Sequence, residues 1–498
     1  MNNTASPICW TIAGSDSGGG AGIQADLKTF NALGVHGCSV ITAITAQNTS
    51  NVDRSALTAA DLVEAQIRCL AKDLPPNAIK IGMVGMMGNI LAMNRYLKNC
   101  NVPVVCDPII MSSSGTRLLD PSALETMKNK LLNQVWLVTP NVAEAELLSG
   151  LTGLTTERFP EAAQRILEYG CSSVLIKGGH SDDVLCHDLW TDGDTMIWMN
   201  SKRVETQNNH GTGCVLSSAI TASLARGEDA GEALLTGKSF VHQALRKSVN
   251  VGEGPGPLGI EPWPQSPLDL PTVTATIEEA KENYTFPSLR PAKFKLYPIV
   301  NDVTWIERLL KTGVELIQLR LKSRDDANRE EEVKKAIELG RQYDAMVIIN
   351  DDWELAIKYG AYGVHLGQDD LYTADMHAIS NAGLRLGVST HSLYEVARAQ
   401  AFSPSYIAIG TINRTTSKEM DYPPLGITRL VELRSLIDVP VVAIGGISLE
   451  NARDCFSSGA DYCAVISDIT QSPDPEARIA TWAHEFSNLS TPRSAPVA

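Results

Sequence analysis

The sequence of 498 residues lacks the features that mark membrane, secreted and nucleic-acid-binding proteins. It has no run rich in Lys or Arg, and its formal net charge of −15 argues against nucleic acid or a membrane surface as partner. No stretch approaches the roughly eighteen apolar residues of a membrane-spanning helix. The N-terminus has no basic region and runs directly into a predicted strand, so we expect no targeting signal and a cytoplasmic protein.

Cysteine pairs with the spacing of a metal site are also missing. The ten cysteines include no C-x-x-C pair, and Cys38, Cys106 and Cys463 lie inside apolar runs, where they read as small core residues. A disulfide framework or a structural zinc site is therefore not expected. The composition, 44% hydrophobic and 20% charged, is that of a globular protein. We expect small-molecule partners and leave a homo-oligomer open.

Pro and Gly gather between residues 252 and 291, as in Gly254-Pro255-Gly256-Pro257, which is linker composition. We predict a first domain over residues 1–265, a linker over 266–292 with a short helix at 274–283, a second domain over 293–490 and a tail over 491–498.

Both domains alternate strands and helices, which predicts an α/β fold class. Eight apolar, β-branched runs in the second domain predict a (β/α)₈ TIM barrel, with an open doubly wound sheet as the alternative. These runs are residues 294–300, 315–321, 346–350, 363–366, 385–390, 406–410, 441–446 and 462–467. The first domain reads as a mostly parallel sheet between two layers of helices, an α/β/α arrangement. Its strand candidates are residues 8–13, 37–43, 78–83, 102–106, 136–139 and 173–177.

Polar residues follow the predicted barrel strands, where active sites of this fold lie. Gln318, Arg320 and Lys322 alternate with leucines and should face the barrel interior, although Arg320 could instead belong to an internal salt-bridge layer. Asp351 and Asp370 follow neighbouring strands, so their carboxylates can converge on Mg²⁺. Helix N-capping is the alternative for any Asp here, and it suits Asp352 and Asp369 better.

Later loops of the barrel offer a cation, hydroxyls and glycines. Thr415-Thr416-Ser417-Lys418 follows the sixth strand, and Gly445-Gly446 and Ile466-Ser467 end the seventh and eighth. Loops at these positions commonly bind phosphate through backbone N–H groups. Two phosphorylated substrates could therefore meet between a metal-bridged site and a glycine-lined site.

The residues at these strand ends resemble those of thiamine-phosphate synthase, which condenses hydroxymethylpyrimidine diphosphate with a thiazole phosphate. The resemblance implies that the pyrimidine diphosphate is held by Gln318, Arg320, Lys322, Asn350, Ser389 and Lys418. It implies Mg²⁺ at Asp351 and Asp370, and a leaving-group role for Lys418. It places the thiazole phosphate at Thr415, Thr416, Ser417, Gly446, Ile466 and Ser467. Ser417 stands where the family more often has Thr.

In the first domain, a glycine-rich run over residues 14–26 follows the first strand, but it lacks the Gly-Lys-Ser/Thr ending of a P-loop. Residues 209–214 precede an apolar helical stretch, so the backbone N–H groups of Gly211, Thr212 and Gly213 could form an anion hole. Cys214 lies in the same helical turn, where the helix dipole favours a thiolate. A small apolar helix start is the alternative.

Three charged residues follow other strands of this domain. Lys177 precedes a glycine turn and could bind the phosphates of ATP. Glu144 and Asp107 are further candidates for Mg²⁺, and a helix cap is the alternative for Asn141 and Glu144.

Taken together, residues 10–258 resemble a hydroxymethylpyrimidine/phosphomethylpyrimidine kinase of the ribokinase superfamily. The resemblance implies that Gln47 reads the pyrimidine edge and that Gly14, Asp26 and Met83 complete the pocket. It places Cys214 where sugar kinases carry an Asp base. The product of the first domain would be the substrate of the second. A pyridoxal-type kinase fused to a different barrel, or a non-enzymatic regulator, are the alternatives.

Overall fold

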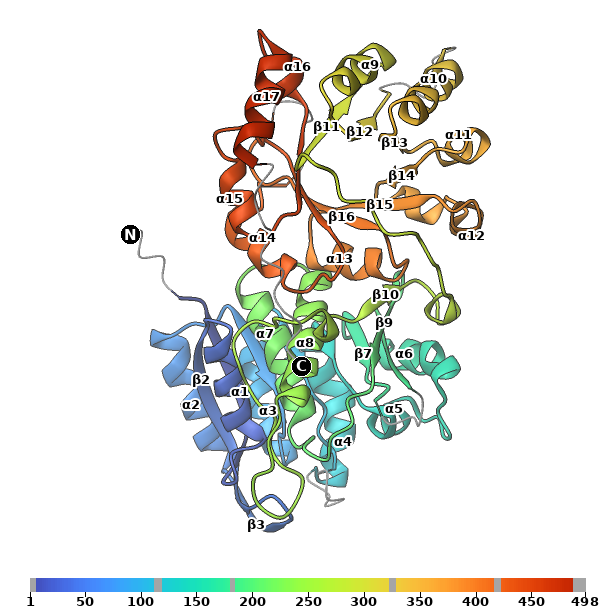
Figure 1. The fold of residues 1–498 in the computed structure, drawn as a ribbon. Helices are drawn as coiled ribbons and strands as arrows, with labels where there is room; N and C mark the ends of the chain where they lie inside the picture. The colour runs from blue at the N-terminus through green and yellow to red at the C-terminus, as the bar shows by residue number, and fades with distance from the viewer. Residues whose placement is uncertain (1–5, 112–118, 180–183, 322–327, 416–421, 487–498) are drawn as a thin grey trace. The chain divides into compact units, whose positions relative to one another are not determined.

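The computed structural model describes residues 6–111, 119–179, 184–321, 328–415 and 422–486. The chain divides into two compact units, the first comprising residues 1–264 and 268–281 and the second residues 265–267 and 282–498. Figure 1 colours the first unit from blue to green and the second from yellow to red. Across the described ranges, none of the helices is long and apolar enough to cross a membrane.

A ten-stranded sheet forms the centre of the first unit, in the order β10-β9-β8-β7-β6-β5-β4-β1-β2-β3. The six strands from β7 to β2 in this order are parallel, and the other neighbours pair antiparallel. The strands are β1 (Ile8–Asp16), β2 (His36–Gln47), β3 (Val52–Leu57), β4 (Ala78–Ile81), β5 (Val104–Cys106), β6 (Leu137–Val138), β7 (Ser173–Ile176), β8 (Leu185–Thr191), β9 (Met196–Lys202) and β10 (Thr272–Thr274). Parallel pairing places the carboxyl ends of the central strands at one edge of the sheet.

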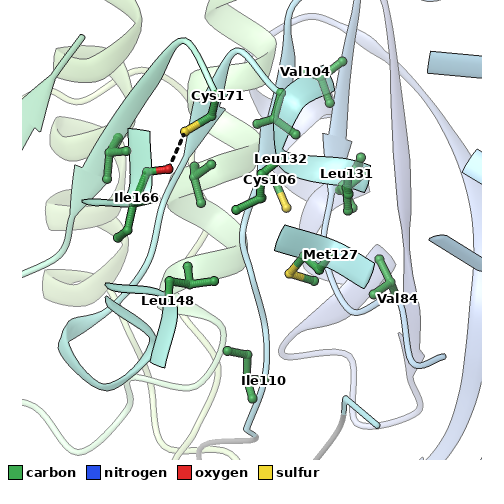
Figure 2. Close-up of a cluster of buried hydrophobic side chains, with 14 of the residues drawn as sticks. Val84, Val104, Cys106, Ile110, Met127, Leu131, Leu132, Leu148, Ile166 and Cys171 are labelled. Atoms are coloured by element: carbon green, nitrogen blue, oxygen red, sulfur yellow. Dashed lines mark hydrogen bonds between the residues drawn. The ribbon is translucent and has the colours of Figure 1, made fainter. Parts of the chain in front are cut away.

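Helices cover both faces of this sheet, as the sequence predicts. Alternate residues of β1 show the two layers: Thr11 bonds to Asp26 of α1, while Trp10 and Ile12 enter the apolar core of the opposite face. Figure 2 shows part of that core, including Cys106, Leu131 and Ile166. The first layer holds α1 (Gly22–Ala32), α7 (Thr212–Ala225) and α8 (Ala230–Arg246). The second holds α2 (Ala60–Asp73), α3 (Met87–Leu97), α4 (Pro121–Thr126), α5 (Val142–Ser149) and α6 (Phe159–Leu167).

The second unit is a closed barrel of eight parallel strands, β11 to β18, so the alternative of an open sheet is excluded. The strands are β11 (Leu296–Val300), β12 (Leu316–Leu319), β13 (Met346–Asn350), β14 (Gly363–Leu366), β15 (Arg385–Thr390), β16 (Tyr406–Ile409), β17 (Val441–Ile444) and β18 (Tyr462–Val465). The helices are α9 (Val303–Lys311), α10 (Arg329–Gln342), α11 (Trp353–Tyr359), α12 (Met376–Asn381), α13 (Leu393–Gln400), α14 (Gly426–Arg434), α15 (Ala452–Ser457), α16 (Ser467–Thr470) and α17 (Pro475–Phe486).

The predicted linker over residues 266–292 is wrong for most of its length. β10 pairs antiparallel with β9 and extends the sheet of the first unit. The helix predicted at residues 274–283 is only a single 3₁₀ turn, Glu279–Lys281. The backbone N–H and C=O groups of β10 find their partners in β9, far away along the chain, and local composition does not predict such pairing.

Residues 286–292 close the amino-terminal mouth of the barrel. Leu289 is 7% exposed and packs among strand-start residues such as Leu316 and Met346. The backbone N–H of Ala292 donates to the hydroxyl of Tyr462 at 3.1 Å. This segment therefore belongs to the barrel fold and not to a free tether.

Candidate active sites

The glycine-rich run after β1 is organised by a side chain that the sequence analysis left without a role. Asp16 is 4% exposed and accepts from the N–H groups of Gly18, Gly20 and Ala21 at 2.8, 3.1 and 2.9 Å. Burial alone would raise the pKa of Asp16, but these N–H donors and a hydrogen bond from His210 lower it below the usual value. Asp16 is therefore a buried carboxylate that the backbone N–H groups of this loop surround.

The amino terminus of α7 lies directly against that loop. Gly211 has a φ of 88°, and a Cβ there would lie 2.0 Å from the carbonyl oxygen of Gly20. Only glycine permits this approach. Two segments almost two hundred residues apart along the chain thus form one wall of a site.

Two charged groups face the start of α7. A Cβ on Gly213 would lie 2.8 Å from Oδ2 of Asp107 and 3.1 Å from Nζ of Lys177. Lys177 Nζ donates to Oδ1 of Asp107 at 2.8 Å, and the Thr139 hydroxyl donates to the same oxygen at 3.2 Å. The structure therefore brings together Lys177, Asp107 and the predicted anion hole, from two strand ends and one helix start.

The charged groups of this cluster shift one another's pKa values. Burial would lower the pKa of Lys177, but the Asp107 and Glu144 carboxylates raise it above its usual value. Burial raises the pKa of Glu144 to about 7, against the opposing effect of Lys177. Glu144 also accepts from the backbone N–H of Asn141 at 2.9 Å, and Asn141 accepts from that of Glu144. The helix cap named as the alternative for these two residues is thus formed.

Cys214 lies in the first turn of α7 and is 6% exposed. Burial raises the pKa of its thiol to about 11, with Lys80 opposing. Desolvation therefore works against the thiolate that the helix start and the nearby Lys80 favour.

Asp26 does not line a pocket as predicted, because it is fully buried. It accepts from Lys80 Nζ at 2.8 and 2.9 Å, from the Thr11 hydroxyl at 2.5 Å and from the Ser218 hydroxyl at 2.8 Å. Burial opposes the charge on Lys80, but the Asp26 carboxylate raises its pKa above the usual range. This buried ion pair joins α1, β4 and α7 beneath the site, so the contribution of Asp26 is structural support.

Gln47, the predicted pyrimidine reader, ends β2 and is half-buried. Its amide nitrogen lies 3.2 Å from Nε2 of His210, which lies 3.2 Å from Oδ2 of Asp16. Met83 is 7% exposed, and a Cβ on Gly14 would lie 3.1 Å from its sulfur. Gly14 in β1, Gln47 at the end of β2 and Met83 just after β4 thus belong to three adjacent parallel strands.

In the barrel, Gln318 is 2% exposed and faces the interior. Arg320 lies one residue past β12 and is exposed, which excludes an internal salt-bridge layer for it. Burial lowers the pKa of His365 to about 4, with the charge of Arg320 adding to the effect and that of Asp370 opposing it. Lys322 lies outside the described residues.

Asp351 directly follows β13 and has a φ of 64°, an uncommon backbone conformation for a residue with a side chain. Its N–H donates to the carbonyl oxygen of His365 at 2.9 Å. Asp370 begins a 3₁₀ turn after β14, and its Oδ2 accepts from the N–H of Gly367 at 3.3 Å. Asn350 is 9% exposed at the end of β13.

The capping expected of Asp352 and Asp369 is not formed, since neither side chain accepts a cap hydrogen bond. Asp352 instead forms an ion pair with Arg329 of α10, whose Nε lies 2.8 Å from Oδ1. Asp352 therefore has a packing role, which distinguishes it from Asp351 and Asp370.

The glycine-lined side of the barrel mouth is also formed. Gly446 has a φ of 62°, and a Cβ there would lie 2.3 Å from the carbonyl oxygen of Arg414, next to Thr415. Ser389 lies in β15, and Ile466 and Ser467 stand where β18 gives way to α16. Thr416, Ser417 and Lys418 lie outside the described residues.

Comparison with known proteins decides the family. The model of phosphomethylpyrimidine kinase matches residues 16–259, and that of thiamine monophosphate synthase matches residues 296–469. The rice (Oryza sativa subsp. japonica) probable thiamine biosynthetic bifunctional enzyme, a chloroplastic protein, is 32% identical over 97% of this chain and 89% of its own length. The chain belongs to the bifunctional thiamine biosynthetic enzymes.

Two further relatives resemble the kinase half of this bifunctional enzyme. The hydroxymethylpyrimidine/phosphomethylpyrimidine kinase of Rhizobium meliloti is 45% identical over 50% of this chain and 96% of its own length. Pyridoxal kinase from Staphylococcus aureus in complex with ADP is 33% identical over 55% of this chain and 99% of its own, with a TM-score of 0.50. These comparisons confirm the ribokinase-like fold and a transferase function in thiamine biosynthesis, and the closed eight-stranded barrel confirms the TIM barrel.

Proposed function

We propose that the chain performs three consecutive reactions. The first unit phosphorylates 4-amino-5-hydroxymethyl-2-methylpyrimidine with ATP, and then its monophosphate. The barrel condenses the resulting diphosphate with 4-methyl-5-(2-phosphooxyethyl)thiazole, giving thiamine phosphate and diphosphate. One observation supports the kinase proposal most directly. Asp107 and Lys177 lie so close to the start of α7 that Gly213 leaves no room for a side chain.

Each group at the kinase site has a definite part in phosphoryl transfer. The N–H groups of Gly211, Thr212 and Gly213 would donate to phosphate oxygens, since helix starts favour anions. Lys177 would balance charge on the transferred group, which is the main catalytic need in this chemistry. Cys214 would accept the proton of the alcohol in the first phosphorylation only. The monophosphate is already ionised and needs no base.

Mg²⁺ is the cation that fits the residues at the barrel mouth. Asp351 and Asp370 follow adjacent parallel strands, and one or two carboxylates plus waters and substrate phosphates are typical of a Mg²⁺ site. In the described part of the chain, no group of three or more His, Cys, Asp or Glu side chains forms a protein cage for a metal. When bound, Mg²⁺ would neutralise charge on the departing diphosphate.

The other barrel residues would bind and orient the two substrates. Gln318, Arg320, Asn350 and Ser389, together with Lys322 and Lys418, would hold the pyrimidine diphosphate. Thr415, Thr416, Ser417, Gly446, Ile466 and Ser467 would hold the thiazole phosphate. The bond from the pyrimidine methylene to diphosphate breaks, and a bond from the methylene to the thiazole nitrogen forms. Lys418 would bind the leaving diphosphate.

A single coupled assay tests the proposal. The full chain is supplied with ATP, Mg²⁺, hydroxymethylpyrimidine and the thiazole phosphate, and we expect thiamine phosphate to form. Failure to form it, with both units folded, would refute the proposal.

A panel of alcohols distinguishes the pyridoxal-type alternative, which the likeness to pyridoxal kinase keeps relevant. We expect the pyrimidine alcohol to be the preferred substrate of the first unit. A higher kcat/KM for pyridoxal would assign this unit to the alternative.

A further inference from the structure

Five polar side chains from five different strands form a continuous hydrogen-bonded chain through the barrel interior. Nε2 of Gln318 donates to the Tyr297 hydroxyl at 3.1 Å, and the Tyr297 and Tyr406 hydroxyls lie 2.8 Å apart. The Tyr406 hydroxyl lies 2.9 Å from Nδ1 of His365, and Nε2 of His365 lies 2.8 Å from the Ser389 hydroxyl. We name these five residues the interior chain.

The middle of the interior chain is buried and tightly packed. Tyr297, Tyr406 and His365 are 1%, 0% and 5% exposed. A Cβ on Gly387 would lie 2.0 Å from Cζ of Tyr406, so this glycine leaves the space that the ring fills. The His365 and Tyr406 rings also stack, with centroids 5.6 Å apart. These groups therefore have little freedom to exchange partners.

The hydrogens in the interior chain must point in one direction. Each hydroxyl and the neutral imidazole have a single hydrogen to donate. With Gln318 donating to Tyr297, the Tyr297 hydroxyl must donate to Tyr406, because an unpaired buried donor is costly. Tyr406 then donates to Nδ1 of His365, and the hydrogen on Nε2 is donated to Ser389.

Turning the Gln318 amide over would reverse every link, since the carbonyl oxygen would then accept from Tyr297. The two ends therefore change together. In the order described here, the Gln318 carbonyl oxygen is left as an acceptor and the Ser389 hydroxyl hydrogen as a donor. In the reverse order, Gln318 offers a donor and Ser389 an acceptor.

We propose that His365 and Tyr406 are positioning residues of the condensation site, which set complementary donor and acceptor roles for the Ser389 hydroxyl and the Gln318 amide. The inference rests on the proposed function, in which both end residues hold the pyrimidine diphosphate. An aminopyrimidine presents an amino donor and ring-nitrogen acceptors, so it requires one acceptor and one donor from the protein. A chain that ties the two ends together supplies such a pair.

Tyr406→Phe removes the central hydroxyl and keeps the ring. We expect the KM for the pyrimidine diphosphate to rise about three- to tenfold, with the KM for the thiazole phosphate and the kinase activity unchanged. Tyr462→Phe is the matched control, because it removes a hydroxyl that binds the N–H of Ala292 at the opposite mouth. A general packing defect would lower the melting temperature and affect both substrates.

A double-mutant cycle tests the coupling itself. Gln318→Ala and Ser389→Ala are combined in the native background and again in the Tyr406→Phe background. In the native background, we expect the loss of kcat/KM in the double variant to differ about three- to tenfold from the product of the two single losses. In the Tyr406→Phe background, we expect it to equal that product. If Tyr406→Phe does not fold, Tyr297→Phe breaks the same chain one link earlier.

A coupling of equal size in both backgrounds, or an unchanged KM in Tyr406→Phe, would overturn the inference. At the other link, His365→Gln can still offer a donor to Ser389 and should retain more activity than His365→Leu. Equal activities would also count against the positioning role. Failure of the proposed function is distinguishable, because the native chain itself would then form no thiamine phosphate.

Discussion

Replacing Gly213 by alanine tests the kinase site at the point where its parts meet. The added methyl carbon would lie 2.8 Å from Oδ2 of Asp107 and 3.1 Å from Nζ of Lys177, closer than such contacts allow. Both side chains would have to withdraw from the start of α7. Alanine is otherwise favourable inside a helix, by about 1 kcal/mol relative to glycine, so the helix itself should not be weakened.

The size of the effect follows from the contacts that are displaced. A hydrogen bond to a charged group contributes about 1.5–3 kcal/mol, and the displaced Lys177 would lose at least one such bond to a phosphate oxygen. We therefore expect kcat/KM for phosphorylation of hydroxymethylpyrimidine to fall roughly ten- to a hundredfold. The melting temperature of the first unit should stay unchanged or rise.

The assay has two internal controls. Condensation by the barrel of the same polypeptide should be unaffected, and Gly179→Ala should leave both activities unchanged. A Cβ on Gly179 has open space around it, two residues from Lys177. Native kinase activity in Gly213→Ala would refute the placement of the transferred phosphate at this helix start.

Four other substitutions test the remaining roles. Cys214→Ala should lower kcat for the alcohol about tenfold or more and leave the monophosphate reaction nearly unchanged, while equal losses would contradict a base. Because the pKa of Cys214 is about 11, the thiolate fraction grows tenfold per pH unit below that value, so kcat for the alcohol should rise with pH in the native protein only. Lys418→Ala should lower kcat of condensation about a hundredfold or more with little change in KM, and an unchanged kcat would exclude the leaving-group role. Asp351→Asn and Asp370→Asn should each raise the Mg²⁺ concentration for half-maximal condensation about tenfold or more, and unchanged Mg²⁺ curves would exclude the metal site.

The barrel could be predicted closely because its strands are short, apolar and bounded by turn residues. β13, β14 and β15 have the predicted bounds. Strands of a parallel barrel are buried on both sides, so each appears as one apolar run between helical patterns. The same apolar runs led to the candidate site, because locating the end of each strand also located the polar residues that follow it.

The edge of the first sheet could not be read in this way. β8, β9 and β10 are antiparallel additions beside β7, and β10 lies within the Pro- and Gly-rich stretch. What makes it a strand is a backbone ladder to β9, which depends on tertiary placement and not on composition.

Burial explains two further differences from the sequence analysis, the position of Asp26 and the raised pKa of Cys214. Asp26 shares the buried stripe of α1 with Ile23 and Phe30, at helical spacing. A charge on that stripe, together with Lys80 inside an apolar strand, could have indicated a buried ion pair. For Cys214, position at a helix start indicated a low pKa, but the depth of the helix start was not visible in the sequence.

Leu289 provides a direct test of where the barrel begins. The composition around it is that of a flexible linker, which predicts no effect of Leu289→Ala. In the structure the side chain is 7% exposed among strand-start residues, so its truncation should destabilise the barrel by about 2–4 kcal/mol in chemical unfolding. Leu268→Ala, at a leucine that is 56% exposed in the same Pro-rich stretch, is the matched control and should cost less than about 0.5 kcal/mol. If both substitutions caused equally small losses of stability, residues 286–292 would have to be assigned to the linker. A large effect of Leu289→Ala alone would establish that the barrel needs the segment before its first strand.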